Sequence, residues 1–133
     1  MRLTKLSRRH RDERGSAIVD FVIVVVLLLP LVAGVLQLAL VLYARNTAMA
    51  AASDGARYGA TLGHGPADGV TRTRSLLDGV SASSFMKDVT GSATTLQGAP
   101  AVAVTVAVRV PALGITGPAV NLTVIGHAVR EMP

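Results

Sequence analysis

The stretch that decides the fold is FVIVVVLLLPLVAGVLQLALVLYA, which runs from Phe21 to Ala44 and contains no charged side chain. At about 1.5 Å of rise per residue, a helix of this length measures roughly 36 Å, and the hydrocarbon core of a bilayer is about 30 Å thick. The stretch therefore predicts a helix that crosses a membrane. Tyr43 and Arg45 close it with side chains suited to the lipid–water interface.

The residues before this stretch form a basic leader. Residues 1–14 contain six basic and two acidic side chains, a net charge of +4, whereas residues 45–133 contain seven basic and five acidic side chains. Because positively charged flanks stay on the cytoplasmic side, the leader, residues 1–15, predicts a cytoplasmic N-terminus and an extracytoplasmic C-terminus. No recognition fold and no aromatic interleaving surround the leader, so we expect no nucleic-acid partner.

The helix is expected to begin near Ser16 and to continue to Leu62, because residues 46–62 are rich in alanine and contain no proline. Small residues recur there every four positions, which places them in rows along the helix. One row is Ala44, Ala48, Ala52, Ala56 and Ala60, and the other is Ala51, Gly55, Gly59 and Gly63. Such rows let helix backbones approach closely, and each glycine would cost a solvated helix up to about 1 kcal/mol. The rows therefore favour packing against a neighbouring helix over an alanine-rich helix in solvent.

The region from residue 63 to 133 predicts a small α+β domain outside the membrane. A glycine-rich break precedes a short helix from Pro66 to Val80. Alternating residues predict two strands, Ala101–Val110 and Ala119–Arg130, which form an antiparallel pair. A third strand has two weaker candidates, Phe85–Thr90 and Ala93–Gln97. The fold class is therefore α+β, with a long N-terminal transmembrane helix, a short helix and a small antiparallel sheet.

The chain contains no pattern that points to catalysis. There is no cysteine, and none of the three histidines, His10, His64 and His127, has a second ligand at metal-type spacing. No G-x-S-x-G elbow, S-x-x-K pattern or phosphate-binding glycine loop is present. We therefore expect that the protein is not an enzyme and that it binds no cofactor and no metal ion.

The junction between leader and helix asks for a separate explanation. Asp20 places a carboxylate at the start of an apolar helix, which costs up to about 2.5 to 3.5 kcal/mol at mid-bilayer and much less at the interface. One interpretation leaves Asp20 among the lipid headgroups. The other places a cut between Gly15 and Ser16, which makes Asp20 the fifth residue of the mature chain. The new amine of Ser16, from the same or a neighbouring subunit, could then pair with the carboxylate.

A set of residues along this helix resembles a known family. The set consists of Arg14-Gly15, Asp20-Phe21, Pro30, Gly34, Gln37 and Gly55-Ala56-Arg57. Over Glu13 to Tyr58 the chain resembles the TadE-like family of the tight-adherence pilus system, whose members are type IV pilin-like proteins. The resemblance implies that Gly15 precedes a prepilin-peptidase cut and that Ser16 becomes the N-terminus. The family usually has glutamate where this chain has Asp20, which is one methylene shorter.

By this resemblance, we expect a minor pilin or pseudopilin in the cell membrane. It would be cut by prepilin peptidase and would pack through its long helix with other pilins and with assembly-platform proteins, to support pilus assembly or adhesion. The implied assembly residues are Asp20, Phe21, Pro30, Gly34 and Gln37. The implied helix-packing residues are Ala48, Ala52, Gly55, Ala56, Arg57 and Gly59.

Two other interpretations stay open. In the first, the protein is a single-pass anchored binding protein that is never cut at Gly15-Ser16 and keeps its leader. In the second, an exported protein is released at Ala48-Met49-Ala50, although the apolar segment is much longer than the 7 to 15 residues of the apolar core (h-region) of a typical signal sequence.

Overall fold

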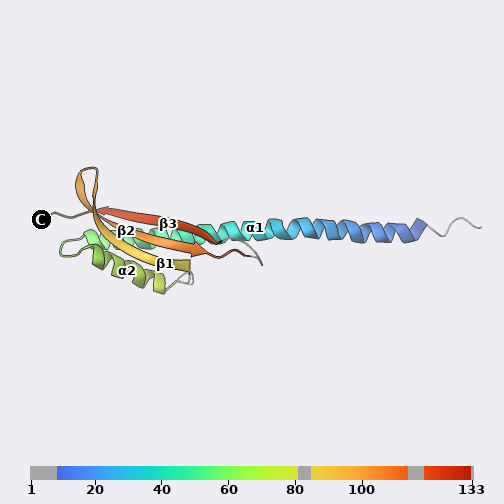
Figure 1. The fold of residues 1–133 in the computed structure, drawn as a ribbon, viewed down its shortest axis with the longest axis horizontal. Helices are drawn as coiled ribbons and strands as arrows, with labels where there is room; N and C mark the ends of the chain where they lie inside the picture. The colour runs from blue at the N-terminus through green and yellow to red at the C-terminus, as the bar shows by residue number, and fades with distance from the viewer. Residues whose placement is uncertain (1–8, 81–84, 114–118, 133) are drawn as a thin grey trace, which may run out of the picture. The chain divides into compact units, whose positions relative to one another are not determined.

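The computed structural model describes residues 9–80, 85–113 and 119–132. Its elements, in chain order, are α1 (Arg9–Ala60), α2 (Pro66–Asp78), β1 (Met86–Leu96), β2 (Ala99–Val110) and β3 (Val120–Val129) (Figure 1). A long apolar helix, a short helix and a three-stranded antiparallel sheet confirm the predicted α+β class. The chain divides into two compact units, Met1–Leu36 and Gln37–Pro133, and the second unit contains the sheet.

Helix α1 begins at Arg9, earlier than the start expected near Ser16, and ends at Ala60. The end of the leader is therefore helical, which corrects the prediction. Residues 9–14 are arginine, histidine, aspartate and glutamate, none of which breaks a helix, and only Gly15 opposes helix formation, by about 1 kcal/mol. The helix also continues through Pro30, which deprives it of one backbone hydrogen bond.

The C-terminal residues of the chain complete the end of α1. The backbone N–H of Glu131 donates to the carbonyl oxygen of Ala60 at 3.0 Å, and the N–H of Thr61 donates to Tyr58 at 3.3 Å. The last turn of a helix leaves carbonyl groups without helical partners, so these bonds satisfy groups that water would otherwise have to solvate. Gly63 then turns the chain with a φ of 81°, a conformation that favours glycine.

Helix α2 begins at Pro66, close to the prediction, with Gly65 as its N-cap. The Asp68 carboxylate accepts a hydrogen bond of 2.8 Å from the N–H of Gly65, the reciprocal half of a capping box. Proline suits the first helical position, because its missing N–H would have no helical partner there.

The sheet has the order β1-β2-β3, and both pairs are antiparallel. Val89, Val106 and Val124 lie opposite one another across the three strands. Strands β2 and β3 match the two predicted strands, and β1 joins both weaker candidates for a third strand into one. Gln97 and Gly98, with φ angles of 52° and 84°, link β1 to β2 in a two-residue hairpin.

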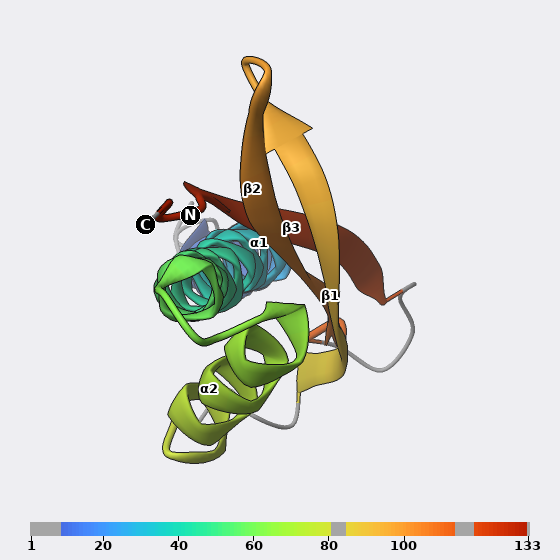
Figure 2. The same cartoon turned by 90° about the vertical axis from the view of Figure 1, so that its left-hand side faces the viewer.

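The core lies between the sheet, the second half of α1 and α2 (Figure 2). Alternate valines of β2 face the helices and are buried: Val102, Val104, Val106, Val108 and Val110. From α1 the core takes the alanine row, and from α2 it takes Leu77. Alanine and valine side chains are small, so they fill only a thin layer between the backbones of the helices and the sheet. The helices and the sheet can therefore approach closely.

Candidate functional site

The candidate processing junction lies inside α1 and is uncovered. Gly15 and Ser16 are exposed, and beyond the neighbouring turns of α1 no atom lies within 4 Å of the position that a Cβ on Gly15 would occupy. The peptide bond between these residues belongs to helical backbone. A peptidase that cuts it has free access, but it must first unwind the local turn.

Asp20 lies one helical turn beyond the junction and is exposed. Residues four apart share a face of a helix, with Cβ atoms about 5 to 6 Å apart, so Ser16 and Asp20 are neighbours on the surface of α1. An amine created at Ser16 would lie within reach of the Asp20 carboxylate. The carboxylate would also stand in the first turns of the shortened helix, where the helix dipole favours a negative charge.

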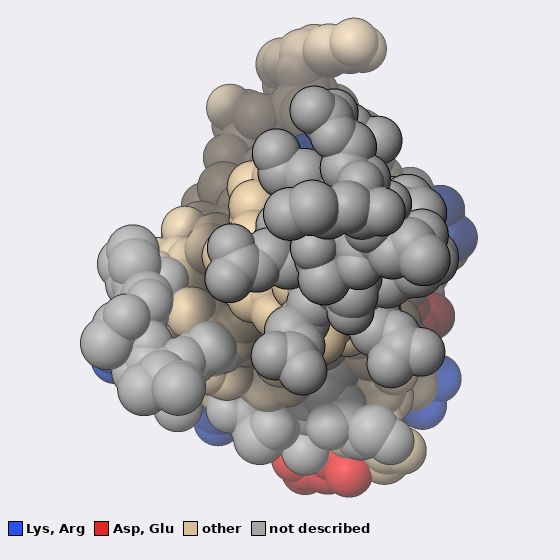
Figure 3. Space-filling model, turned by 90° about the vertical axis from the view of Figure 1, so that its right-hand side faces the viewer, with Lys and Arg blue, Asp and Glu red and all other residues tan. Residues whose placement is uncertain are grey.

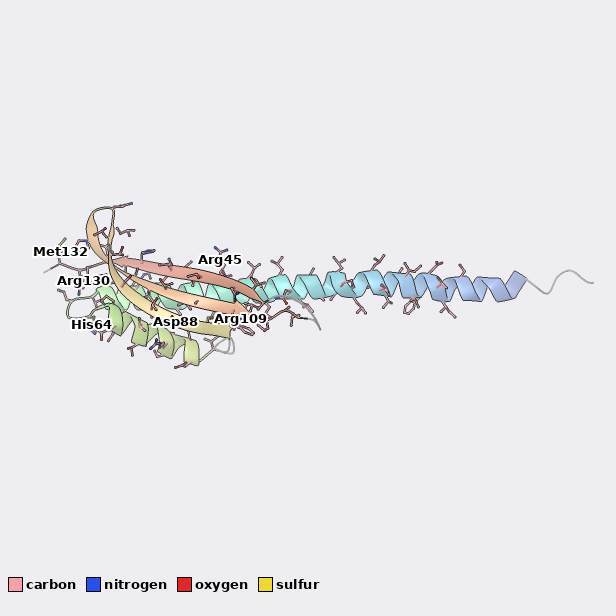
Figure 4. All side chains as sticks on the ribbon, viewed as in Figure 1. Arg45, His64, Asp88, Arg109, Arg130 and Met132 are labelled. Carbon is pink, nitrogen blue, oxygen red and sulfur yellow. The ribbon has the colours of Figure 1, made fainter. Side chains whose placement is uncertain are left out.

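The apolar surface of α1 from Ile18 to Leu36 is uncovered in its own unit. Its large side chains project from the helix on both sides in Figure 4, and Phe21 keeps 69% of its surface exposed. Among the described residues, one helix, Gly15–Ala60, is long and apolar enough to cross a membrane. Burying a large aliphatic side chain is worth about 1.5 to 3 kcal/mol, so this surface is stable only against lipid or other apolar helices.

Pro30 and Gly34, two implied assembly residues, lie in this uncovered surface. Gly34 has no atom within 4 Å of its Cβ position other than those of its own helical turns, and Pro30 is exposed. Both positions are therefore available to a neighbouring helix. Together with Gly15, Ser16, Asp20 and Phe21 they lie along one stretch of helix in the first unit.

Gln37, the fifth implied assembly residue, has a different environment. Its side-chain Nε2 donates to the carbonyl oxygen of Pro111 at 3.2 Å, and its Oε1 accepts from the N–H of Leu113 at 2.6 Å. Both ends of the amide thus bind the backbone that follows β2, 74 and 76 residues away along the chain. Gln37 closes the small domain against its own helix.

The small residues of both rows that lie within α1 are buried in the chain itself, whereas Gly63, the last residue of the second row, lies beyond the helix and is exposed. Ala44, Ala48, Ala52, Ala56 and Ala60 are almost completely inaccessible to solvent. A Cβ on Gly55 would collide with the side chain of Thr73 and with the carbonyl oxygen of Gly69, and one on Gly59 would lie 2.8 Å from the carbonyl oxygen of Gly65. The neighbouring helix of the glycine row is therefore α2 of the same chain, and the core covers the alanine row. Within this chain, the helix that the glycines of the second row admit is α2.

Arg57 does not belong to the packed surface, although the resemblance groups it with the packing residues. Its side chain is exposed on α1. In the last turn of the helix it stands near the negative end of the helix dipole, where a basic side chain is favoured. One turn back on α1, Asp54 accepts a hydrogen bond of 2.9 Å from Nε of Arg72 in α2, and both side chains are about half exposed.

The residues of α2 and β3 against which α1 packs were not identified from the sequence. The hydroxyl of Thr73 is buried in α2 and lies within hydrogen-bonding distance of the carbonyl oxygens of Gly69, at 2.9 Å, and Ala51, at 3.3 Å. Gly126 of β3 lies against the main chain of Ala52. The available signal was the glycine inside each element, because glycine within a helix or strand often marks a close approach of another backbone.

At the far end of α1, Tyr58 and His64 lie together, with their ring centroids 4.4 Å apart. The Nδ1 of His64 is 3.2 Å from the hydroxyl of Thr61, and Arg130 donates to the backbone carbonyl of His64 at 3.0 Å. These contacts tie the chain after α1 to the end of β3. In the part of the chain that the structure describes, no three His, Cys, Asp or Glu side chains are grouped so that they could hold a metal ion.

Comparison with known proteins assigns the first part of the chain. Residues 15–57 match the family model described as TadE-like protein, which confirms the predicted resemblance over those residues. No curated protein and no solved structure shows significant similarity to the chain. The match includes the junction, the uncovered apolar surface and the first part of the packed helix. Residues 15–57 of the chain are therefore similar to TadE-like proteins, and among the described residues the helix Gly15–Ala60 is the candidate for a single-pass membrane anchor.

Proposed function

We propose that the protein is a minor pilin or pseudopilin of a tight-adherence pilus. It enters the membrane with its N-terminus in the cytoplasm, and prepilin peptidase cuts it between Gly15 and Ser16. The uncovered part of α1 then packs with other pilins and with assembly-platform proteins to support pilus assembly or adhesion. The observation that carries the proposal is the division of α1 into an uncovered apolar part headed by Gly15, Ser16 and Asp20, and a buried part that holds the domain.

This division suits a subunit that leaves the membrane to join a filament. The small domain already covers the packed rows of α1, so one face of the helix between Gln37 and Ala60 is occupied within the chain. The apolar surface before Gln37 needs a cover, which lipid supplies first and neighbouring helices can supply later. In an apolar filament interior the Asp20 carboxylate needs a partner of opposite charge, and a cut at Gly15 creates one.

A second candidate is an anchored binding protein that keeps its leader. It is favoured by the helical backbone at Gly15-Ser16, because α1 begins at Arg9 and a cut requires that this turn unwind. In that case the small domain would bind its target outside the membrane while the whole of α1 serves as an anchor.

Co-expression with prepilin peptidase separates the two candidates. The wild-type chain should become shorter on a gel by the length of the leader, and Gly15→Val should stay uncut. Gly34→Val is the matched control, since it makes the same substitution on the same helix outside the junction and should be cut like the wild type. A wild-type chain of unchanged length, in a host that cuts a known prepilin, would favour the uncut anchor.

A further inference from the structure

The backbone that follows β2 reaches back along α1 to a level inside the apolar run. Gln37 lies seven residues before Ala44, so on a helix it stands about 10 Å before the end of the run. Its hydrogen bonds to Pro111 and Leu113 hold the end of β2 at that level. Part of the domain thus stands beside helix that, by its composition, belongs in lipid.

The side-chain amide of Gln37 pairs with two backbone groups at this contact. Irregular backbone is tolerated at membrane depth only where its N–H and C=O groups find partners in the protein. Pro111 has no N–H, its carbonyl accepts from Gln37, and the N–H of Leu113 donates to the same amide. A glutamine in an apolar helix also needs partners, and here it uses both its nitrogen and its oxygen.

The side chains around this contact are apolar and uncovered. Leu113 keeps 48% of its surface exposed and Val120 is exposed as well, and Leu38 and Leu42 are exposed on α1 within about one turn of Gln37. Pro111 is exposed on the same segment. The boundary between headgroups and acyl chains accepts apolar side chains next to backbone groups that bind either protein or interfacial water.

Basic side chains stand just beyond this apolar group. Arg109 precedes Pro111 by two residues, and Arg45 follows Gln37 by about two turns of α1. Both are exposed and are labelled along the domain in Figure 4. Blue basic and red acidic side chains are both visible near the edge of the view in Figure 3. Arginines at this height match the phosphates of lipid headgroups.

We propose that the end of β2, with Leu113 and Val120 at its surface, is seated in the membrane and anchors the domain to the headgroup and acyl boundary beside α1. The occupant of this surface is lipid. The hydrocarbon is then crossed by residues 21–36, about 24 Å of helix, and the remainder of the apolar run lies in the boundary region. The proposal requires only that α1 be in the membrane; it does not depend on cleavage or on the pilus.

The test uses the full chain, which has no cysteine, so single cysteines can be introduced without background. Leu113→Cys, Val120→Cys, Ser92→Cys and Leu29→Cys are each labelled with an environment-sensitive dye and placed in lipid nanodiscs, one chain per disc. Spin-labelled lipids with the quencher near the headgroup or deep in the acyl chain then report the depth of each dye. Ser92 is an exposed residue of β1 and serves as the matched control in the domain, and Leu29 controls for insertion of the helix.

We expect the dyes at Leu113 and Val120 to lose most of their fluorescence to the shallow quencher and to emit at shorter wavelength. The dye at Ser92 should be unquenched, and the dye at Leu29 should respond to the deep quencher. If Leu113 and Val120 behave like Ser92 while Leu29 is quenched, the proposal is overturned and the membrane helix stands. If these two positions are shielded only when several chains share a disc, another copy of the chain is the occupant and the proposal is also overturned.

Discussion

Gly126 of β3 lies against the main chain of Ala52 in α1 so closely that a Cβ on Gly126 would stand 2.5 Å from the Ala52 carbonyl oxygen. Helix and sheet thus meet backbone to backbone at this point. The contact depends on two small residues, an alanine of the buried row and a glycine in the interior of a strand. It shows why the second half of α1 is so rich in small side chains.

Gly126→Ala should destabilise the domain by about 1 to 3 kcal/mol, because the added methyl group meets main-chain atoms that cannot move aside as a side chain could. His127→Ala is the neighbouring control, since this exposed residue lies on the other face of β3, and it should change stability by less than about 0.5 kcal/mol. Urea unfolding of the detergent-solubilised chain, followed by circular dichroism, measures both. Equal stability of Gly126→Ala and the wild type would mean that β3 does not pack on α1.

Gly55→Ala distinguishes a packed helix from a solvated one. In a solvated helix the change would stabilise by up to about 1 kcal/mol, whereas here the new methyl group would collide with Thr73 and Gly69 of α2. We expect a lower unfolding temperature. Gly34→Ala makes the same change on the same helix where no such neighbour lies within 4 Å, and it should leave the unfolding temperature equal or higher. A stabilised Gly55→Ala variant would contradict the packing of α1 on α2.

Gln37→Leu should loosen the end of β2 without harming insertion of the helix, because leucine is more apolar than glutamine. The loss of two hydrogen bonds, each worth about 1 kcal/mol, should lower the stability of the domain by about 1 to 2 kcal/mol. Limited proteolysis in detergent should then cut between residues 111 and 119 faster than in the wild type. Leu38→Ala, an exposed neighbour, is the control and should be cut at the wild-type rate. If Gln37→Leu were cut at the wild-type rate, Gln37 would not hold the end of β2, and only its implied role in assembly would be left.

Asp20→Ala should insert into the membrane normally and fail to enter pili, because the carboxylate matters only when an amine has to be matched in an apolar interior. Asp20→Asn keeps the shape and removes the charge, so it should fail in the same way, whereas Asp20→Glu should assemble. The measurement compares the amount of each variant in membranes with the amount in sheared pili. Wild-type recovery of Asp20→Asn in pili would show that the charge has no part in assembly.

The first part of α1 was predictable because its signal is local. An uncharged run of this length has few alternatives to a membrane helix, and Gly15, Asp20, Pro30 and Gly34 carry the family resemblance in one continuous segment. The start of the helix at Arg9 was missed because its residues form no apolar face from which a helix could be recognised. The sequence of this part of α1 does not identify the lipid or helix that covers it.

The second part of α1 shows the limit of such reasoning. The spacing of its small residues predicts a close approach of another backbone, but an alanine or glycine row does not identify the partner. Gly69 and Thr73 of α2 and Gly126 of β3, which meet this row, lie further along the chain. The role of Gln37 was hidden for the same reason, since its partners are 74 and 76 residues away.

Strand β1 was difficult to predict because both of its faces carry small or polar residues. Gly91 and Ala93 face the helices, and Ser92 and Thr94 lie on the opposite face, so the alternation of apolar and polar side chains is weak. The two-residue turn at Gln97 and Gly98 was also difficult to predict, because the usual signal of such a turn is asparagine or aspartate before the glycine. The prediction therefore gave two short candidate strands where the structure has one.

The most direct test of the account is the intact mass and N-terminal sequence of the protein isolated from membranes of a host that contains prepilin peptidase. The account predicts a chain that begins at Ser16 and has lost residues 1–15. A chain that begins at Met1 would contradict it, because the amine that Asp20 is proposed to meet would then not exist.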